Sequence, residues 1–300
     1  MTSPSDSPTA HARIRSELGT LVVRGPDRAT WLNGLLTCDV RALASGHGAW
    51  GLALTRAGKI QSDIWVLPGS GKHEGSLFVA VSSEQAPKLY QEFDRMLIME
   101  DAELLEHSAD YAWISLFGEA AAQLGEVLAT EHDGACAALS WTTIRGAALV
   151  VPRQALSACE AQLERASVSV LGDVQWDTFR IGHSLPEFGR DYSEADRPHE
   201  AALERRAVCW TKGCYLGQEV VCMQDMRGKV KRSLRRLRAE TALAPRPGVA
   251  VMAAGAAIGK VTSVASENDH WLCFAQVKLE SLGADALELD GIPGEVGLVD

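Results

Sequence analysis

The sequence lacks the features that would place the protein in a membrane or outside the cell. No apolar run approaches the length of a membrane-spanning helix, and residues 1–12 are rich in Ser, Pro and Thr, unlike a secretory signal. The seven cysteines are an odd number without a Cys-x-x-Cys pair, which disfavours a secreted disulfide framework and a simple zinc site. We predict a cytoplasmic protein without membrane contact, with a disordered tail over 1–16.

Positive charge is also scarce. Lys and Arg number 29 against 39 Asp and Glu, and the net charge of -10 argues against general nucleic-acid binding, although it leaves room for a local basic patch. Hydrophobic residues make up 46% of the chain, enough for a packed core. Three hundred residues can fill one large domain or two to three small ones.

The stretch 210–219, Trp-Thr-Lys-Gly-Cys-Tyr-Leu-Gly-Gln-Glu, carries the strongest chemical signal. Gly213 and Gly217 allow left-handed or tightly folded backbone, so that another segment or a ligand can approach closely. Cys214 becomes a nucleophile or metal ligand only as thiolate, and a cation such as Lys212 would lower its pKa. The alternative is an inert cysteine buried in a glycine-rich turn.

The first hundred residues alternate strands and helices. A hairpin is predicted from strands 50–55 and 60–67, joined by Arg56-Ala57-Gly58-Lys59. Asp63 lies within the second strand, either on its solvent face or as a polar contact to a ligand.

Residues 111–171 follow the order βαββαβ, which is typical of a split ferredoxin-like unit. The two central strands are predicted to meet at a tight Arg145-Gly146 turn.

The remainder reads as a helix over 173–181, then a polar loop with one or two helical turns over 201–207. Short apolar strands separated by turns over 249–280 predict a small barrel. The acidic segment 287–300 is predicted to fray.

Seven basic residues are concentrated between positions 227 and 238 of this acidic chain. Successive side chains of a strand point to opposite faces, so that only part of the run can line one groove. One interpretation is a solvated edge strand, whose charges discourage pairing with other sheets. The other is a grip on anionic groups, such as a folate polyglutamate tail or RNA phosphates.

Cys209, Cys214 and Cys222 could converge on iron only if the loop folds suitably, and no fourth ligand is evident. Transient chemistry at Cys214 is therefore favoured over a resident metal site.

The stretch 212–219 resembles the signature of the YgfZ family, folate-binding-like proteins of iron–sulfur cluster maintenance related to the glycine cleavage T-protein. The matching residues are Lys212, Gly213, Cys214, Tyr215, Gly217, Gln218, Glu219, and the later pair Arg227-Gly228. Pro198-His199-Glu200 is similar to the family's Pro-x-Glu. Three positions depart from the pattern of the family or of its T-protein relatives: Met223 replaces an arginine, Gly182 a pterin-binding glutamate, and Ser62 one of two adjacent acids.

The resemblance implies an α+β, T-protein-like multi-domain fold. It assigns 17–110 with 172–235 to a folate-binding-like domain, 111–171 to the ferredoxin-like domain and 236–300 to a C-terminal β-barrel. The expected function is iron–sulfur cluster assembly or repair, linked to tRNA modification, with a tetrahydrofolate-like ligand in a central cavity.

Within that function, the resemblance assigns the reactive thiol to Cys214, positioned by Lys212 and Glu219. The residues expected to bind the folate are Asp63, Gly213, Tyr215, Gly217, Gln218, Arg227 and Lys229. Iron–sulfur client or assembly proteins are the expected partners, with an RNA contact through the basic run. The alternative is a folate-dependent aminomethyl or methyl transferase, against which Ser62 and Gly182 both argue.

Overall fold

The structure is a computed structural model that describes residues 10–141, 144–228, 230–283 and 286–299. The chain divides into two compact units, residues 1–51 with 63–172 and residues 52–62 with 173–300. The domains predicted from the sequence, which group 17–110 with 172–235, divide the chain differently and stay a prediction.

The first unit contains a sheet with the strand order β10-β1-β7-β9-β8. Along the chain, the elements after residue 110 alternate as β7, α3, β8, β9, α4 and β10, so the predicted βαββαβ order is confirmed. Both helices pack on the sheet over a buried core that includes Ile114, Leu149 and Leu163. The bounds are β7 Tyr111–Gly118, α3 Ala121–Glu131, β8 Ala135–Trp141, β9 Ile144–Pro152, η2 Arg153–Ala155, α4 Leu156–Arg165 and β10 Ser169–Val170.

Two local predictions in this unit are wrong. Strand β1 (Ala10–Ile14) occupies part of the expected tail and lies between β10 and β7, antiparallel to β7. Ala12 is fully buried there. The neighbouring strands supply hydrogen-bond partners for the backbone of this segment, which is too short to be recognised as a strand from its own sequence. Arg145 and Gly146 lie inside β9 and pair with Ser140 and Leu139 rather than forming a turn.

The second sheet has the order β3-β4-β5-β2-β6. The predicted hairpin is confirmed, with β3 and β4 flanking a turn in which Thr55 N donates to Lys59 O at 2.8 Å. Both strands pass from one unit into the other, and the hairpin tip, 52–62, belongs to the second unit. The bounds are β2 Leu18–Arg24, α1 Arg28–Asn33, β3 Ala49–Leu54, β4 Ile60–Pro68, η1 Gly71–His73, β5 Leu77–Ser82, α2 Ala86–Asp94 and β6 Glu103–Glu106.

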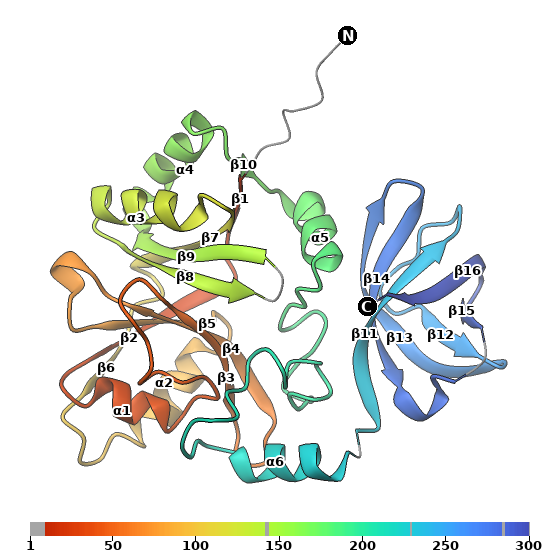
Figure 1. Cartoon of the computed structure of the whole chain (residues 1–300), viewed down its shortest axis with the longest axis horizontal. Coiled ribbons are helices and arrows are strands. Elements are labelled where there is room, and N and C mark those ends of the chain that lie inside the picture. Colours follow the sequence, from red (N-terminus) through yellow and green to blue (C-terminus); the bar gives the residue numbers. More distant parts are fainter. Residues whose placement is uncertain (1–9, 142–143, 229, 284–285, 300) are drawn as a thin grey trace. The chain divides into compact units, whose positions relative to one another are not determined.

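The end of the chain forms a closed barrel in the order β11-β14-β13-β12-β15-β16, drawn in blue in Figure 1. Its interior includes Leu237, Val251, Cys273 and Leu289, all buried. The predicted barrel is confirmed, but the predicted fraying of 287–300 is wrong: β15 and β16 close the barrel, and their hydrogen bonds outweigh the acidic composition. The bounds are β11 Arg232–Glu240, β12 Ala250–Ala253, β13 Ala256–Glu267, β14 His270–Lys278, η3 Leu279–Ser281, β15 Leu287–Leu289 and β16 Ile292–Val299.

Barrel closure contradicts the edge-strand interpretation of the basic run, and the grip on anionic groups stays a prediction. Strand β11 pairs with β14 on one side and with β16 on the other, so it is not an edge strand. Its charges therefore do not serve to protect an open sheet edge.

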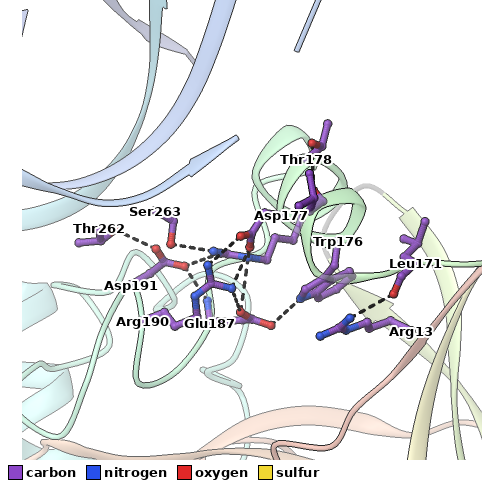
Figure 2. A network of polar contacts seen from close by, with 12 residues as sticks. Arg13, Leu171, Trp176, Asp177, Thr178, Glu187, Arg190, Asp191, Thr262 and Ser263 are labelled. Carbon is purple, nitrogen blue, oxygen red and sulfur yellow. Dashed lines mark hydrogen bonds and ion pairs between the residues drawn. The ribbon is translucent and has the colours of Figure 1, made fainter. Parts of the chain in front are cut away.

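A buried arginine joins helix α5 (Asp173–Gly182) to the barrel. Arg180 is wholly buried; its Nε donates to Asp177 Oδ1 at 2.7 Å and its Nη1 to Asp191 Oδ2 at 2.6 Å. Its Nη2 donates to Ser263 Oγ on β13 at 2.7 Å, and Figure 2 shows these partners around the end of α5. One guanidinium therefore connects the helix, the loop that follows it and the barrel.

A second set of contacts surrounds this arginine. Arg190 donates to both oxygens of Asp177 at 2.8 Å, and Trp176 Nε1 donates to Glu187 Oε1 at 2.6 Å. Burial acts to raise the pKa of Asp177, but hydrogen bonds from Arg190 and the charge of Arg180 lower it overall. The network therefore holds Asp177 ionised in the folded protein.

Candidate functional site

The second unit contains a long stretch without regular structure between α5 and α6 (Gln218–Arg227). The predicted helical turns over 201–207 are not helix: hydrogen-bonded turns occupy these residues, with Ala202 at a φ of 56°. Helix α6 was not predicted. It begins inside the signature, at Gln218, so the stretch expected to be a loop is a loop only up to Gly217 and a helix after it.

Gly217 sets the start of that helix. It is the N-cap of α6 with a φ of 81°, a left-handed conformation that favours glycine. A Cβ on Gly217 would lie 2.5 Å from the backbone oxygen of Thr55 in the hairpin tip. Gly58 in the same tip has a φ of 69°, and its Cβ would lie 3.0 Å from Val220 on α6. The signature and the hairpin tip thus fit together through two glycines.

Gly213 has no comparable constraint. A Cβ there would meet nothing within 4 Å, and its φ is not in the left-handed region. Of the two glycines that flank Cys214 in the sequence, the structure therefore requires glycine at position 217 but not at position 213.

The Cys214 side chain is exposed, whereas its neighbours Lys212 and Tyr215 are 8% and 7% exposed. The Lys212 ammonium lies 5.4 Å from the centroid of the Tyr215 ring, a cation–π contact. A buried lysine and tyrosine thus anchor the loop on both sides of the exposed thiol. The influence of Lys212 on the chemistry of Cys214 stays a prediction.

Tyr215 has an unusual environment for a phenol. Burial raises its pKa, and the nearby thiols Cys222 and Cys209 act in the same direction. Its hydroxyl is buried without a hydrogen-bond partner among the described residues. A buried hydroxyl of this kind fits a polar ligand atom or a water molecule.

The remaining signature residues lie on α6. Gln218 is its first residue, and Glu219 is an exposed acid in its first turn, where a negative charge stabilises the helix dipole. Arg227 is in the last turn, before Gly228 in the left-handed C-cap. Lys229 lies outside the described residues.

A recess of about 250 Å³ lies where Met223 replaces the family's arginine. It is lined by Arg197, Val220, Met223, Gln224 and Arg227. Arg197 and Arg227 thus place two guanidiniums beside Met223, the position where the resemblance expects a third. Gln224 Oε1 is buried and has no hydrogen-bond partner among the described residues. We find in this recess the groups that could hold an anionic end of a ligand.

The Pro-His-Glu motif joins α6 to the barrel. His199 Nε2 lies 3.2 Å from Asp225 Oδ1 on α6, and Glu200 Oε2 accepts a hydrogen bond from Arg197 N at 2.9 Å. Glu200 Oε1 also lies 3.7 Å from Nε of Arg232, the first residue of β11, which pairs in addition with Asp196 at 2.7 Å. The motif therefore links helix α6 to the first strand of the barrel.

Asp63 lies on β4 in the first unit, half-buried and with polar partners. Its neighbour Ser62 is fully buried. The other predicted site residues that the structure describes lie in the second unit.

Across the described ranges, from 10 to 299 with their gaps, no group of three or more His, Cys, Asp or Glu side chains is arranged to hold a metal ion. Over the same ranges, every helix is too short or too polar to span a bilayer.

Comparison with known proteins adds to this geometry. The GCVT N-terminal domain model matches residues 15–160. The glycine cleavage system aminomethyltransferase T of Bartonella henselae superposes with a TM-score of 0.79 over 97% of this chain and 85% of its own, at 19% identity. The tRNA-modifying protein YgfZ of Vibrio vulnificus (strain YJ016) is 24% identical over 238 residues, 77% of this chain and 70% of that protein. Sequence and fold thus make the chain similar to the YgfZ and GcvT proteins, and they support a YgfZ/GcvT-like family.

An aminomethyltransferase of Thermosynechococcus vestitus is also similar to this chain, at 26% identity over 265 residues, 83% of this chain and 70% of that one. The resemblance inferred from 212–219 is thereby confirmed, as is the α+β fold with its ferredoxin-like order and terminal barrel.

Proposed function

We propose that this YgfZ/GcvT-like protein is an accessory factor for iron–sulfur cluster assembly or repair, linked to tRNA modification, and that it acts through Cys214. The observation that carries the proposal is the exposure of Cys214 beside two buried anchors, Lys212 and Tyr215. An exposed thiol can reach a partner protein or its cluster, and its thiolate is a ligand for iron. The names of YgfZ relatives support the link to tRNA modification.

We further propose that the protein binds a tetrahydrofolate-like ligand. Arg197 and Arg227 would hold its carboxylates, since guanidinium groups pair with carboxylates in a fork. The buried Tyr215 hydroxyl and Gln224 Oε1 offer polar atoms that still need partners. When bound, a reduced folate would supply a one-carbon carrier. Asp63, Gly213, Gly217, Gln218 and Lys229 stay proposed contacts.

Aminomethyl or methyl transfer is the second candidate. Similarity to an aminomethyltransferase sequence and to an aminomethyltransferase structure favours it. Against it, Ser62 stands where the T-protein pattern has one of two adjacent acids, and Gly182 stands where that pattern has a pterin-binding glutamate. One-carbon turnover by purified protein, given tetrahydrofolate and an aminomethyl donor, would place the transferase first.

Replacing Cys214 with serine is expected to abolish complementation of a strain that lacks its own YgfZ protein. The hydroxyl is nearly isosteric but does not ionise near neutral pH, so it neither attacks nor ligates as a thiolate. Growth and the activity of an iron–sulfur enzyme in the same cells give two readings. Cys209→Ser, in the same loop, is the matched control and should rescue. Full rescue by Cys214→Ser would remove the thiol from the proposal.

Reduced folate is expected to change the fluorescence of Trp210, whose indole donates to Glu204 O at 2.8 Å at the start of the signature loop. Arg227→Gln should weaken the binding seen in this titration roughly tenfold, because it removes one charge-assisted contact. Arg205→Gln, at an arginine whose side chain is 90% exposed, serves as the control. A saturating titration without any change, confirmed by calorimetry, would exclude the folate.

A further inference from the structure

A second recess, of about 310 Å³, lies where the barrel meets the segment after α5. Its size is at the lower end of small-molecule sites, about 300 to 1,000 Å³. Its lining comprises Ser184, Pro186, Ala201, Ala202, Arg206, Leu234, Arg235, Arg236, Phe274 and Val299. Three of these residues are arginines and none is acidic. The recess is therefore strongly cationic, in a protein whose net charge is -10.

Backbone carbonyls and a hydroxyl orient the three guanidiniums. Arg206 Nη1 donates to Ser184 O at 2.5 Å, and Arg235 Nη1 donates to Ser233 Oγ at 3.0 Å and Leu234 O at 3.1 Å. Arg236 donates to the carbonyls of Ile181 and Gly182 at the end of α5.

Such contacts position all three arginines, and those of Arg206 and Arg235 do not compensate the guanidinium charge. Over the described residues, Arg206 and Arg235 have no carboxylate within ion-pair distance, and each donates hydrogen bonds there through only one nitrogen, Nη1. Partial burial lowers the pKa of Arg206, Glu204 acts in the opposite direction, and the nearby charge of Arg236 lowers it further. Like charges held this close are stabilised by an anion between them.

The neighbouring arginines of the same strand behave differently. Arg232 pairs with Asp196 at 2.7 Å, and Arg238 pairs with Glu240 at 3.1 Å. Leu234 and the buried Phe274 add an apolar floor to the recess. Within β11, Arg232 and Arg238 are thus paired with carboxylates, whereas Arg235 and Arg236 line the recess.

We propose that this recess binds a phosphate group of a small phosphorylated ligand or of RNA. Several guanidinium forks converging on one place suit a group with two or more charges and three or four acceptor oxygens. A single carboxylate has two acceptor oxygens and one charge, so it needs only one fork. The site is separate from Cys214 and does not depend on the function proposed for it.

Calorimetric titration of the full-length protein tests this, with separate arms for inorganic pyrophosphate, a nucleoside diphosphate, a short single-stranded RNA and triglutamate. Pyrophosphate or the diphosphate should bind, more weakly at about 0.15 M salt than at low salt. Binding of RNA alone would identify nucleic acid as the source of the phosphate. Tighter binding of triglutamate, or no binding in any arm, would overturn the proposal.

Variants locate the binding. Arg206→Gln and Arg235→Gln should each weaken phosphate affinity roughly 10- to 100-fold, because each removes a charge-assisted fork. The phosphate affinity of Arg206→Lys, which keeps the charge but not the fork, should lie between those of these variants and the wild type. Arg238→Gln on the same strand and Cys214→Ser should bind as the wild type does. Unchanged affinity in the folded Arg206 and Arg235 variants would refute this site.

Discussion

Replacing Arg180 with methionine is expected to lower the free energy of unfolding by about 3–5 kcal/mol, a large share of the stability of an ordinary domain. Arg180 is fully buried, and its partners Asp177 and Asp191 lie 2.7 and 2.6 Å away. Methionine fills a similar length without charge, so Asp191, itself fully buried, would lose its nearest cation. The cost comes chiefly from the carboxylates left behind.

Urea unfolding followed by circular dichroism, with tryptophan fluorescence as a second probe, measures this loss. Arg205→Met is the matched control, because Arg205 is 90% exposed and lies 3.9 Å from Glu204; its effect should stay within about 0.5 kcal/mol. The loss of unfolding free energy for Arg180→Lys should fall between those for Arg180→Met and Arg205→Met. An ammonium keeps the charge but cannot reach the three partners as a planar guanidinium fork does. A loss under about 1 kcal/mol for Arg180→Met would show that the network relaxes around the gap.

The fold could be predicted from the sequence wherever apolar periodicity was strong. The βαββαβ order over 111–171, the hairpin around residues 56–59 and the helix over 173–181 all follow from local pattern, and the structure contains them. Strand β1 and the strands after residue 286 could not be predicted in this way. Their order comes from pairing with distant strands, which neither composition nor periodicity reveals.

The candidate site was predictable as a motif but not as a geometry. A lysine, a cysteine and a glutamate at positions 212, 214 and 219 indicate thiol chemistry. The sequence does not show that α6 begins at Gln218. A signal for that helix was present: an acid in the first turn, and Arg227-Gly228 at the end.

Arg180 and Arg197 went unrecognised for a different reason. The partners of Arg180 include Asp191, across an irregular loop, and Ser263, 83 residues further along the chain. Arg197 and Arg227 are 30 residues apart in the sequence but line the same recess. No local pattern encodes such contacts. Buried polar networks therefore need the structure, even where the motif beside them is evident.

Gly217→Ala is the second change for which a large effect is expected, a loss of about 2–4 kcal/mol of unfolding free energy. Alanine in the left-handed region costs about 1–2 kcal/mol. Its Cβ would also lie 2.5 Å from Thr55 O, a backbone atom that moves only if the hairpin tip shifts. We expect this shift to disturb the start of α6, and with it the loop that presents Cys214.

Gly213→Ala separates this account from a general need for glycine around the thiol. A Cβ at Gly213 meets nothing within 4 Å, so its unfolding free energy should change by no more than about 0.5 kcal/mol. Denaturant unfolding and the complementation assay should agree, with Gly217→Ala impaired in both and Gly213→Ala intact in both. If Gly213→Ala were stable but failed to complement, the alanine methyl group would be blocking access to Cys214, and Gly213 would contribute to function directly. Equal destabilisation by the two alanines would contradict the role given to the contact between Gly217 and Thr55.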